Sequence, residues 1–174
     1  GIVRNQDYFT KEKNIKFRVR TLAERIDPAG QKISITDLET GTSEELEYDY
    51  LVLATGGKPV IPPIPGIDLP KVIVLHHPDD GVRINEIVRN GAKNIVVIGG
   101  GLIGLEAAAA IGNPKRKVTI VEKESQLLPG LLDFEMATLV KDELKQNKIE
   151  VVLGQEVIAI QENGEAGKKV ILTQ

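Results

Sequence analysis

Cysteine is absent from all 174 residues, and this absence excludes three kinds of chemistry. Without a thiol, the chain can form no disulfide framework, no thiolate metal site and no redox dithiol within these residues. Tryptophan is also absent, aromatic residues make up only 3% of the chain, and histidine occurs twice. Any redox reaction must therefore depend on a cofactor or on residues outside this sequence.

Neither sign of charge dominates, since 22 basic and 25 acidic residues leave a net charge of −3. Such a balance gives no electrostatic reason to expect nucleic acid or a membrane as a partner. A chain that is 41% hydrophobic can bury a core, in one domain or in two small ones. No basic-then-apolar leader is visible, so we expect a cytoplasmic protein.

Long apolar runs are also missing, apart from residues 95–111, which only Glu106 interrupts with a charge. A membrane-spanning helix needs about 20 apolar residues. Three consecutive glycines at 99–101 would also disrupt such a helix. We therefore predict a buried strand, a tight turn and a helix.

The two histidines, His76 and His77, are adjacent and stand just before a predicted helix. Neighbouring side chains do not converge on a metal ion, and no third ligand has a suitable spacing. We predict loop or capping residues and no metal site.

Alternating and continuous apolar patterns predict strands in the first third of the chain. Alternation predicts strands over 15–20 and on both sides of a turn at 27–30, and the apolar run 51–54 predicts a strand buried on both faces. Five prolines within 58–70 then predict a stiff extended connector. Beyond it we expect strands near 71–75, 94–98, 118–121, 149–153, 157–160 and 170–172, and helices after His77, Gly101 and Asp133.

Residues 14–26 and 148–160 can be aligned without a gap, and their apolar positions coincide. Alternation alone could produce part of this match. A true repeat would mean two similar dinucleotide-binding domains, the first without its beginning and the second without its end. Because the sequence also starts without methionine, we expect it to be a piece of a longer protein.

The pattern Gly99-x-Gly101-x-x-Gly104 follows a predicted strand and opens a predicted helix. In this context the first glycine permits a tight turn, and the second lets the backbone approach a pyrophosphate. The third lets the helix pack closely on the strand. The alternative is a glycine-rich turn that binds nothing.

Glu122 ends the next strand, 18 residues after Gly104. A carboxylate there accepts hydrogen bonds from the ribose hydroxyls of adenosine and repels a 2′-phosphate, which favours NADH over NADPH. Lys123 and the basic run 115–117 weaken this argument because a cation offsets the repulsion. The alternatives are a solvated charge at Glu122 and a solvated loop at 115–117.

With these motifs the chain resembles the pyridine nucleotide–disulfide oxidoreductases, a family of FAD flavoproteins, over nearly its whole length. The matching stretches are "YDYLVLATGGKPVIPPIPGIDLP" and "NIVVIGGGLIGLEAA" with "VTIVEK". Within the family the chain is most similar to NADH oxidases, coenzyme A–disulfide reductases and polysulfide or persulfide reductases.

The resemblance implies an α/β fold of the FAD/NAD(P)-binding Rossmann-like type, with a parallel sheet, a three-stranded β-meander and two tandem partial domains. Residues 1–70 would be a partial FAD-binding domain with a proline-rich linker. Residues 71–174 would be an NAD(H)-binding domain without its C-terminal strand. The full-length protein would be a homodimer.

The resemblance also assigns cofactor-binding residues, while the redox cysteine of this branch would lie before the segment. Leu102 stands where many relatives have an aromatic gate over the flavin, and Glu106 matches a carboxylate near the nicotinamide or is an ordinary helix-face charge. The residues expected to bind NAD are Gly99, Gly100, Gly101, Leu102, Ile103, Gly104, Glu106, Glu122, Lys123 and Val157, and those expected to border FAD are Ala54, Thr55 and Gly56.

The resemblance implies the central portion of an FAD-dependent NADH oxidoreductase. Hydride would pass from NADH to the flavin and on to a disulfide, a persulfide or polysulfide, or oxygen. No catalytic residue would lie in this segment, which by itself would be inactive. The alternatives are a non-catalytic NADH-binding module and a single-domain dehydrogenase, the latter disfavoured because no catalytic His or Tyr-Lys arrangement is present.

Overall fold

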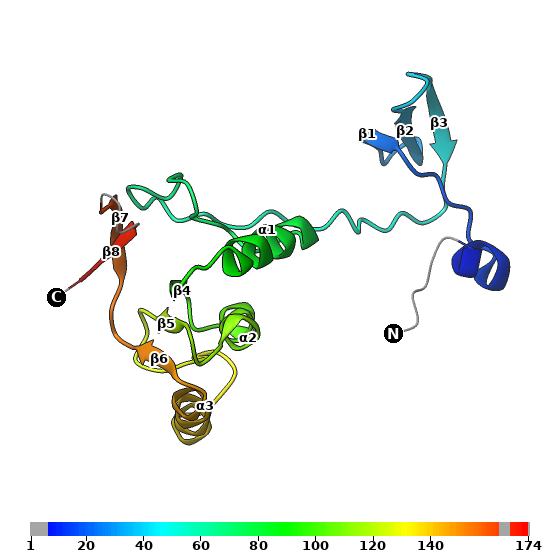
Figure 1. Ribbon diagram of the computed structural model, residues 1–174. Coiled ribbons are helices and arrows are strands. Elements are labelled where there is room, and N and C mark those ends of the chain that lie inside the picture. Colours follow the sequence, from blue (N-terminus) through cyan, green and yellow to red (C-terminus); the bar gives the residue numbers. More distant parts are fainter. Residues whose placement is uncertain (1–6, 164–167, 174) are drawn as a thin grey trace. The chain divides into compact units, whose positions relative to one another are not determined.

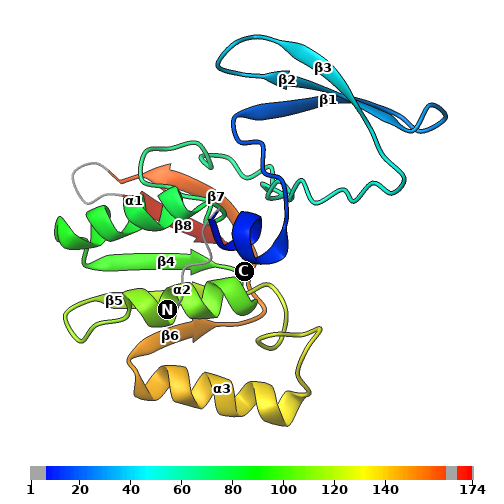
Figure 2. The same ribbon diagram turned by 90° about the vertical axis from the view of Figure 1, so that its right-hand side faces the viewer.

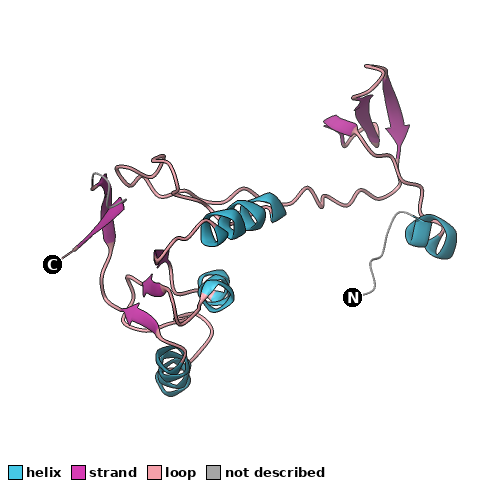
Figure 3. Cartoon of the chain, in the orientation of Figure 1, coloured by secondary structure: helices cyan, strands magenta, loops and turns pink. Residues whose placement is uncertain are grey.

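A computed structural model describes residues 7–163 and 168–173 of the chain (Figure 1). Internal contacts divide the chain into two compact units, residues 1–56 and 57–174. Strands dominate the first unit, and helices alternate with strands in the second (Figure 3). The proline-rich segment, which the sequence analysis grouped with the first domain up to residue 70, is grouped by these contacts with the second unit.

The first unit is built around an antiparallel meander in the order β1-β2-β3 (Figure 2). Ile35, in the central strand, is its buried hydrophobic residue. The predicted three-stranded meander is therefore confirmed. The elements of the first unit are a short π-helix η1 (Tyr8–Glu12), β1 (Thr21–Asp27), β2 (Lys32–Asp37) and β3 (Ser43–Glu47).

Two strands predicted in the first unit do not form, over residues 15–20 and 51–54. Val52 and Leu53, expected to be buried, are 83% and 67% exposed. A strand exists only where a neighbouring strand satisfies its backbone groups. Among the described residues of this unit, no strand pairs with either segment. The prediction that these two segments form strands was therefore wrong.

The second unit contains a parallel sheet in the order β4-β5-β6 and a separate antiparallel hairpin of β7 and β8. Within residues 7–163 and 168–173, no helix is both long and apolar enough to cross a bilayer. The elements are α1 (Pro78–Arg89), β4 (Asn94–Ile98), α2 (Leu102–Ile111), β5 (Lys117–Val121), α3 (Phe134–Gln146), β6 (Ile149–Val152), β7 (Val157–Glu162) and β8 (Lys168–Leu172).

One face of the parallel sheet carries the main core of the second unit. Val118 of β5 is opposite Ile149 of β6 in the parallel register, so both side chains lie on this face. They are buried together with Ala108 of α2 and Leu144 of α3. The methyl group of Ala108, which is fully buried, lets α2 lie close to the sheet. The main core therefore holds α2 and α3 against the parallel sheet, whose strand β4 leads into the glycine turn.

A second apolar cluster joins the β7–β8 hairpin to the proline-rich segment. Val157 and Ile160 of β7 are buried there, and Ile64 and Ile67 pack against them. The backbone N–H of Ile160 donates to the carbonyl of Pro65 at 2.8 Å. The later half of the predicted connector is therefore part of a core rather than a free spacer.

The strand predicted over 71–75 is absent as well. Val72 instead donates its N–H to the carbonyl of Leu69 at 3.0 Å, which closes a turn. Its side chain packs into the cluster at the hairpin. Because hairpin packing rather than a neighbouring strand partners this segment, the prediction of a strand was wrong.

The aligned segments 14–26 and 148–160 share three backbone features in addition to their apolar pattern. Two are left-handed residues, a conformation uncommon outside glycine. The third is a register shift that follows in the paired strand. The corresponding features are φ of 54° at Asn14 and 61° at Lys148, φ of 51° at Arg20 and 67° at Gly154, and register shifts at Ala23/Arg25 and Val157/Ala159. These coincidences support a structural repeat.

Helix α1 begins with a capping box that uses both histidine positions. The Asp80 carboxylate accepts from the backbone N–H of His77 at 2.8 Å and of His76 at 3.0 Å. The ring Nδ1 of His77 accepts from the N–H of Asp79 at 3.3 Å. The predicted capping role of His77 is confirmed, and the described residues contain no cluster that could hold a metal ion.

Replacing Asp80 with asparagine is expected to weaken the second unit at neutral pH and to flatten its acid dependence. The N–H groups of His77 and His76 hold the pKa of Asp80 below its ordinary value of 3.8. A carboxylate with a lowered folded-state pKa stabilises the fold above 3.8, and this contribution is lost as pH falls through the lower value. Urea unfolding at pH 7 and below about pH 4 measures the effect.

Asp79→Asn is the matched control for this change. The Asp79 carboxylate lies on the same helical turn but contacts only the His77 ring, at 3.3 Å. This control should retain the acid dependence of the wild type. An Asp80→Asn variant that lost stability with falling pH as steeply as the wild type would contradict the assignment.

Candidate functional site

The carboxyl ends of the three parallel strands lie in register at one edge of the sheet (Figure 2). Gly99 directly follows β4 and donates its N–H to the carbonyl of Val121 at 2.8 Å. Glu122 directly follows β5 and donates to the carbonyl of Val152 at 2.9 Å. In open α/β sheets, ligands bind at this edge. The fold therefore brings the glycine turn and Glu122 together, as the sequence predicted.

Two glycines of the turn are required by the chain itself. Gly99 has a φ of +105°, which residues with a side chain rarely adopt. A Cβ at Gly104 would lie 2.1 Å from the carbonyl oxygen of Gly99. These two residues make the turn tight and let α2 start close to β4, the roles expected from their spacing.

Gly100 faces inward and is buried. A Cβ there would lie 2.7 Å from the Leu127 side chain and 3.1 Å from Cβ of Glu122. Its N–H donates to Oε2 of Glu122 at 2.6 Å, and its carbonyl accepts from the N–H of Leu128 at 3.1 Å. The chain thus supplies partners for both polar groups of Gly100, and its predicted contact with a cofactor stays a prediction.

Gly101 differs from its neighbours because nothing in its own surroundings requires a glycine. Its φ of −81° and ψ of 179° suit any residue, and a Cβ would have no atom within 4 Å. It is also the N-cap of α2, where serine, threonine, asparagine and aspartate are favoured over most residues. A ligand occupying the open space beside Gly101 would explain the missing side chain.

The first turn of α2 offers backbone donors next to this open space. The first intrahelical bond joins the N–H of Leu105 to the carbonyl of Gly101, so the N–H groups before it have no acceptor within the helix. They form the positive end of the helix dipole, where anions bind. The side chains of Leu102 and Ile103 are 57% and 64% exposed beside them. The arrangement suits a phosphate group flanked by apolar surface.

Glu122 is 8% exposed, so it is not the solvated charge of the alternative interpretation. Its Oε2 accepts from Gly100 and its Oε1 from the N–H of Glu124 at 2.9 Å. A carboxylate offers about four acceptor positions, which leaves two for the hydroxyls of a ligand. Lys123 beside it is exposed, with its Nζ 3.9 Å from Oε1 of Glu124.

The remaining predicted residues are divided between the two units. Val157, expected beside an adenine, is 5% exposed within the cluster at the hairpin, where its visible role is packing. Glu106 is exposed on α2. Ala54, Thr55 and Gly56 are exposed at the end of the first unit, with Gly56 at a φ of +72°. Their contacts with cofactors stay predictions.

Arg116 corrects the interpretation of 115–117 as a solvated loop. Its guanidinium donates to the carbonyls of Ile111 at 3.1 Å and Val88 at 3.5 Å, at the ends of α2 and α1. Lys117 pairs with Glu150 at 3.1 Å. Two of the three basic side chains are therefore engaged in the fold, and a lone basic run gives no signal of that from sequence.

Part of the β5–α3 loop, which no sequence motif predicted, packs against the glycine turn. Leu127 is almost fully buried against Gly100, and Leu128 reaches its carbonyl from a left-handed conformation, with φ of +51°. The adjacent leucines before Pro129 gave a weak signal of a buried loop. Only the folded chain brings them to the turn.

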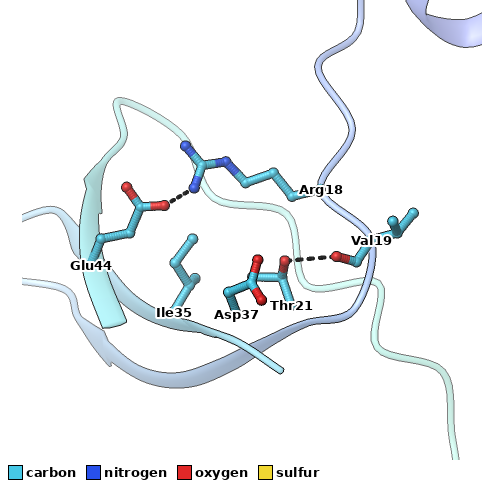
Figure 4. Close-up of a pocket in the computed structure, with 6 residues that line it drawn as sticks. All are labelled: Arg18, Val19, Thr21, Ile35, Asp37 and Glu44. Atoms are coloured by element: carbon cyan, nitrogen blue, oxygen red, sulfur yellow. Dashed lines mark hydrogen bonds and ion pairs between the residues drawn. The ribbon is translucent and has the colours of Figure 1, made fainter. Parts of the chain in front are cut away.

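Two surface hollows are lined by residues outside the glycine turn. The first, in the first unit, is lined by Arg18, Val19, Thr21, Ile35, Asp37 and Glu44 (Figure 4). Arg18 pairs with Glu44 across it, and the Asp37 carboxylate accepts from the turn that follows it. The second lies between α3 and β6 and includes no residue of the glycine turn. The candidate site is therefore described by its backbone geometry.

Comparison with known proteins agrees with this geometry. Residues 3–174 match the family described as pyridine nucleotide-disulphide oxidoreductase. An NADH oxidase of Methanocaldococcus jannaschii is 38% identical over 153 residues, which cover 87% of this chain and 34% of that protein. The chain therefore spans about a third of the length of such relatives.

Solved structures show the same relationship. The NAD-dependent persulfide reductase from A. fulgidus superposes with a TM-score of 0.83 at 37% identity, covering 98% of this chain and 31% of that one. A water-forming NADH oxidase from Lactobacillus brevis bound to NADH superposes with a TM-score of 0.74 at 26% identity, covering 87% and 33%.

The fold and cofactors expected from the resemblance are confirmed at the level of the family. The matching structures share the Rossmann-like α/β architecture; one, from Desulfovibrio vulgaris, is described as a FAD-dependent pyridine nucleotide-disulphide oxidoreductase, and the Lactobacillus brevis enzyme is bound to NADH. The match extends over almost the entire sequence. The chain belongs to the pyridine nucleotide-disulphide oxidoreductase family.

Proposed function

We propose that this chain is the central portion of an FAD-dependent NADH oxidoreductase and that its second unit binds NADH. The pyrophosphate would lie against Gly101 and the N-terminus of α2, and the adenosine ribose against Glu122. The observation that carries the proposal is the open space at Gly101, a glycine that neither backbone conformation nor packing requires. The NADH-bound relative supports the identity of the ligand.

The residues of this chain would bind and orient the coenzyme rather than perform the chemistry. Unsatisfied N–H groups at the start of α2 would hold the negative pyrophosphate without desolvating a side chain. The exposed side chains of Leu102 and Ile103 would exclude water beside it. FAD, when bound, supplies the group that accepts hydride from the coenzyme. We propose that residues 1–70 contribute part of its site, with Ala54, Thr55 and Gly56 at its border.

Glu122 favours NADH as the coenzyme in this proposal. Its carboxylate is buried and already accepts two backbone hydrogen bonds, so it cannot turn away from a ligand without leaving donors unpaired. A 2′-phosphate would meet this charge directly. Lys123, which is exposed and only loosely paired with Glu124, offsets the repulsion in part.

The electron acceptor would be a sulfur compound or oxygen, reached through parts of the protein beyond this chain. This proposal follows from relatives named NADH oxidase, persulfide reductase and CoA-dependent sulfur oxidoreductase. We further propose that the full-length protein is a cytoplasmic homodimer that binds neither nucleic acid nor membranes.

The absorption spectrum of the purified full-length protein tests the proposal. With FAD bound, addition of NADH under anaerobic conditions should bleach the flavin bands, and NADPH should bleach them more slowly. A colourless protein that FAD cannot reconstitute would contradict the enzyme assignment. A protein that binds NADH without bleaching would instead be the non-catalytic NADH-binding module.

A further inference from the structure

Gly100 is held through both of its flanking peptide groups. Its N–H donates to Oε2 of Glu122 at 2.6 Å, and its carbonyl accepts from Leu128 at 3.1 Å. Gly100 and Glu122 are both buried, as are Leu127 and Leu128. These two groups lie on consecutive peptide groups, Gly99–Gly100 and Gly100–Gly101, and a buried, hydrogen-bonded peptide group has one favoured orientation. The middle of the turn is therefore set by the β5–α3 segment and not by the glycines alone.

Glu122 is itself held by the end of the sheet. Its N–H donates to the carbonyl of Val152 at 2.9 Å, and its own carbonyl accepts from the N–H of Gln155 at 3.2 Å. Its Oε1 accepts from Glu124 at 2.9 Å. The side chain thus projects from a fixed backbone and is itself fixed at both oxygens. It can transmit the position of β5 and β6 to the glycine turn.

We propose that Glu122 is a positioning residue for the glycine turn, in addition to the ribose ligand of the proposed function on which this inference rests. The Gly100 N–H is buried and donates to Oε2 of Glu122 at 2.6 Å. Loss of the carboxylate would leave this donor unsatisfied, and the Gly99–Gly100 peptide group would rotate toward another partner or water and change the backbone angles at Gly100. Gly101, the next residue in the chain, would move with it. One side chain therefore couples recognition of the ribose to recognition of the pyrophosphate.

Two nucleotides separate the positioning role from the ribose role. ADP carries the diphosphate and both ribose hydroxyls, whereas 2′,3′-dideoxy-ADP carries the diphosphate but neither hydroxyl. Their affinities would be measured by calorimetry on the full-length protein with FAD in excess, so that any site in the first unit is filled. The variants are Glu122→Ala, Glu122→Gln and, as matched control, Glu124→Ala. Glu124 is nearby and equally charged, but its side chain contacts only Lys123 at 3.9 Å.

Glu122→Ala is expected to weaken 2′,3′-dideoxy-ADP by about tenfold or more, the scale of one hydrogen bond to a charged group. Glu122→Gln should recover part of that loss, because its amide oxygen can accept from Gly100 while its amide nitrogen cannot accept from Glu124. Glu124→Ala should bind both nucleotides as the wild type does. Equal affinity of wild type and Glu122→Ala for the dideoxy nucleotide would overturn the positioning role.

The outcome for ADP distinguishes this inference from the proposed function. Failure of the wild type to bind ADP would overturn the proposed function, and the positioning role for a coenzyme with it. Binding of ADP together with an unaffected dideoxy nucleotide would overturn the positioning role alone.

Amide hydrogen exchange in the ligand-free protein gives a second readout if Glu122→Ala folds poorly. The Gly100 amide should exchange slowly in the wild type. Because the carboxylate is its acceptor, the amide should exchange at least tenfold faster in Glu122→Gln than in Glu124→Ala. The Leu105 amide, bonded within α2, should be unchanged. A Gly100 amide that exchanges in the wild type as fast as that of Gly101 would overturn the inference.

Discussion

Alanine at position 101 is expected to weaken NADH binding by about ten- to a hundredfold while leaving the fold intact. The added methyl group would enter the space assigned to the pyrophosphate, and overpacking by one methyl group costs about 1–3 kcal/mol. No atom of the chain lies within 4 Å of that methyl position, and the backbone there suits alanine. Titration of NADH into the full-length protein measures the affinity.

Stability should change little, because two small effects at this position oppose each other. Alanine is a poorer N-cap than glycine, but it reduces the entropy of the unfolded chain. Gly81→Ala on α1 is the matched control, since its methyl group also meets open space, and it should bind NADH normally. If Gly101→Ala bound NADH with wild-type affinity, the pyrophosphate would not lie in the open space beside Gly101, and the proposed function would lose its main support.

Alanine at position 66 is expected to cause the largest loss of stability, about 3 kcal/mol or more. The new Cβ would lie 1.9 Å from the carbonyl oxygen of Ile160, and the φ of +84° is strained for any residue with a side chain. Relief requires the backbone to move away from β7. That movement would break the bond between Pro65 and Ile160 and loosen the packing of Ile64.

Thermal and urea unfolding of the full chain test this expectation. Gly57→Ala is the matched control, because it lies at the start of the same proline-containing segment, has no positive φ and meets no atom within 4 Å. It should unfold as the wild type does. If Gly66→Ala were equally stable, the later half of that segment would not be anchored to the hairpin.

The behaviour of the four glycines shows how far the motif could be interpreted without coordinates. The spacing of Gly99, Gly101 and Gly104 predicted a turn, a close approach and helix packing. Gly100 was expected to contact NAD, but the spacing gave it no structural role. The folded chain gives it one, because Glu122 and Leu127 occupy the space where its side chain would be. This reason comes from residues more than twenty positions away, which spacing alone does not reveal.

The strand predictions failed for a related reason. Alternation around Phe17 and the apolar run before Ala54 describe the preference of each segment, but a strand also needs a neighbour for its backbone groups. In β6 that neighbour is β5, so the aligned copy of the first segment does pair. Helices met no such requirement, since their hydrogen bonds are internal. The predicted helices after His77, Gly101 and Asp133 all formed.

Local signals were enough to predict the parallel β-α-β order, the helix caps, the position of the glycine turn and the carboxylate that ends the neighbouring strand. These features depend on local backbone preferences and on apolar periodicity within a few turns or strands. Long-range contacts, by contrast, turn Gly100 inward, bury Glu122 against it, join two helix ends through Arg116 and pack the proline-rich segment on β7. Each of these rests on a contact between residues distant in the chain, and such contacts exist only once hydrophobic burial has brought the elements together.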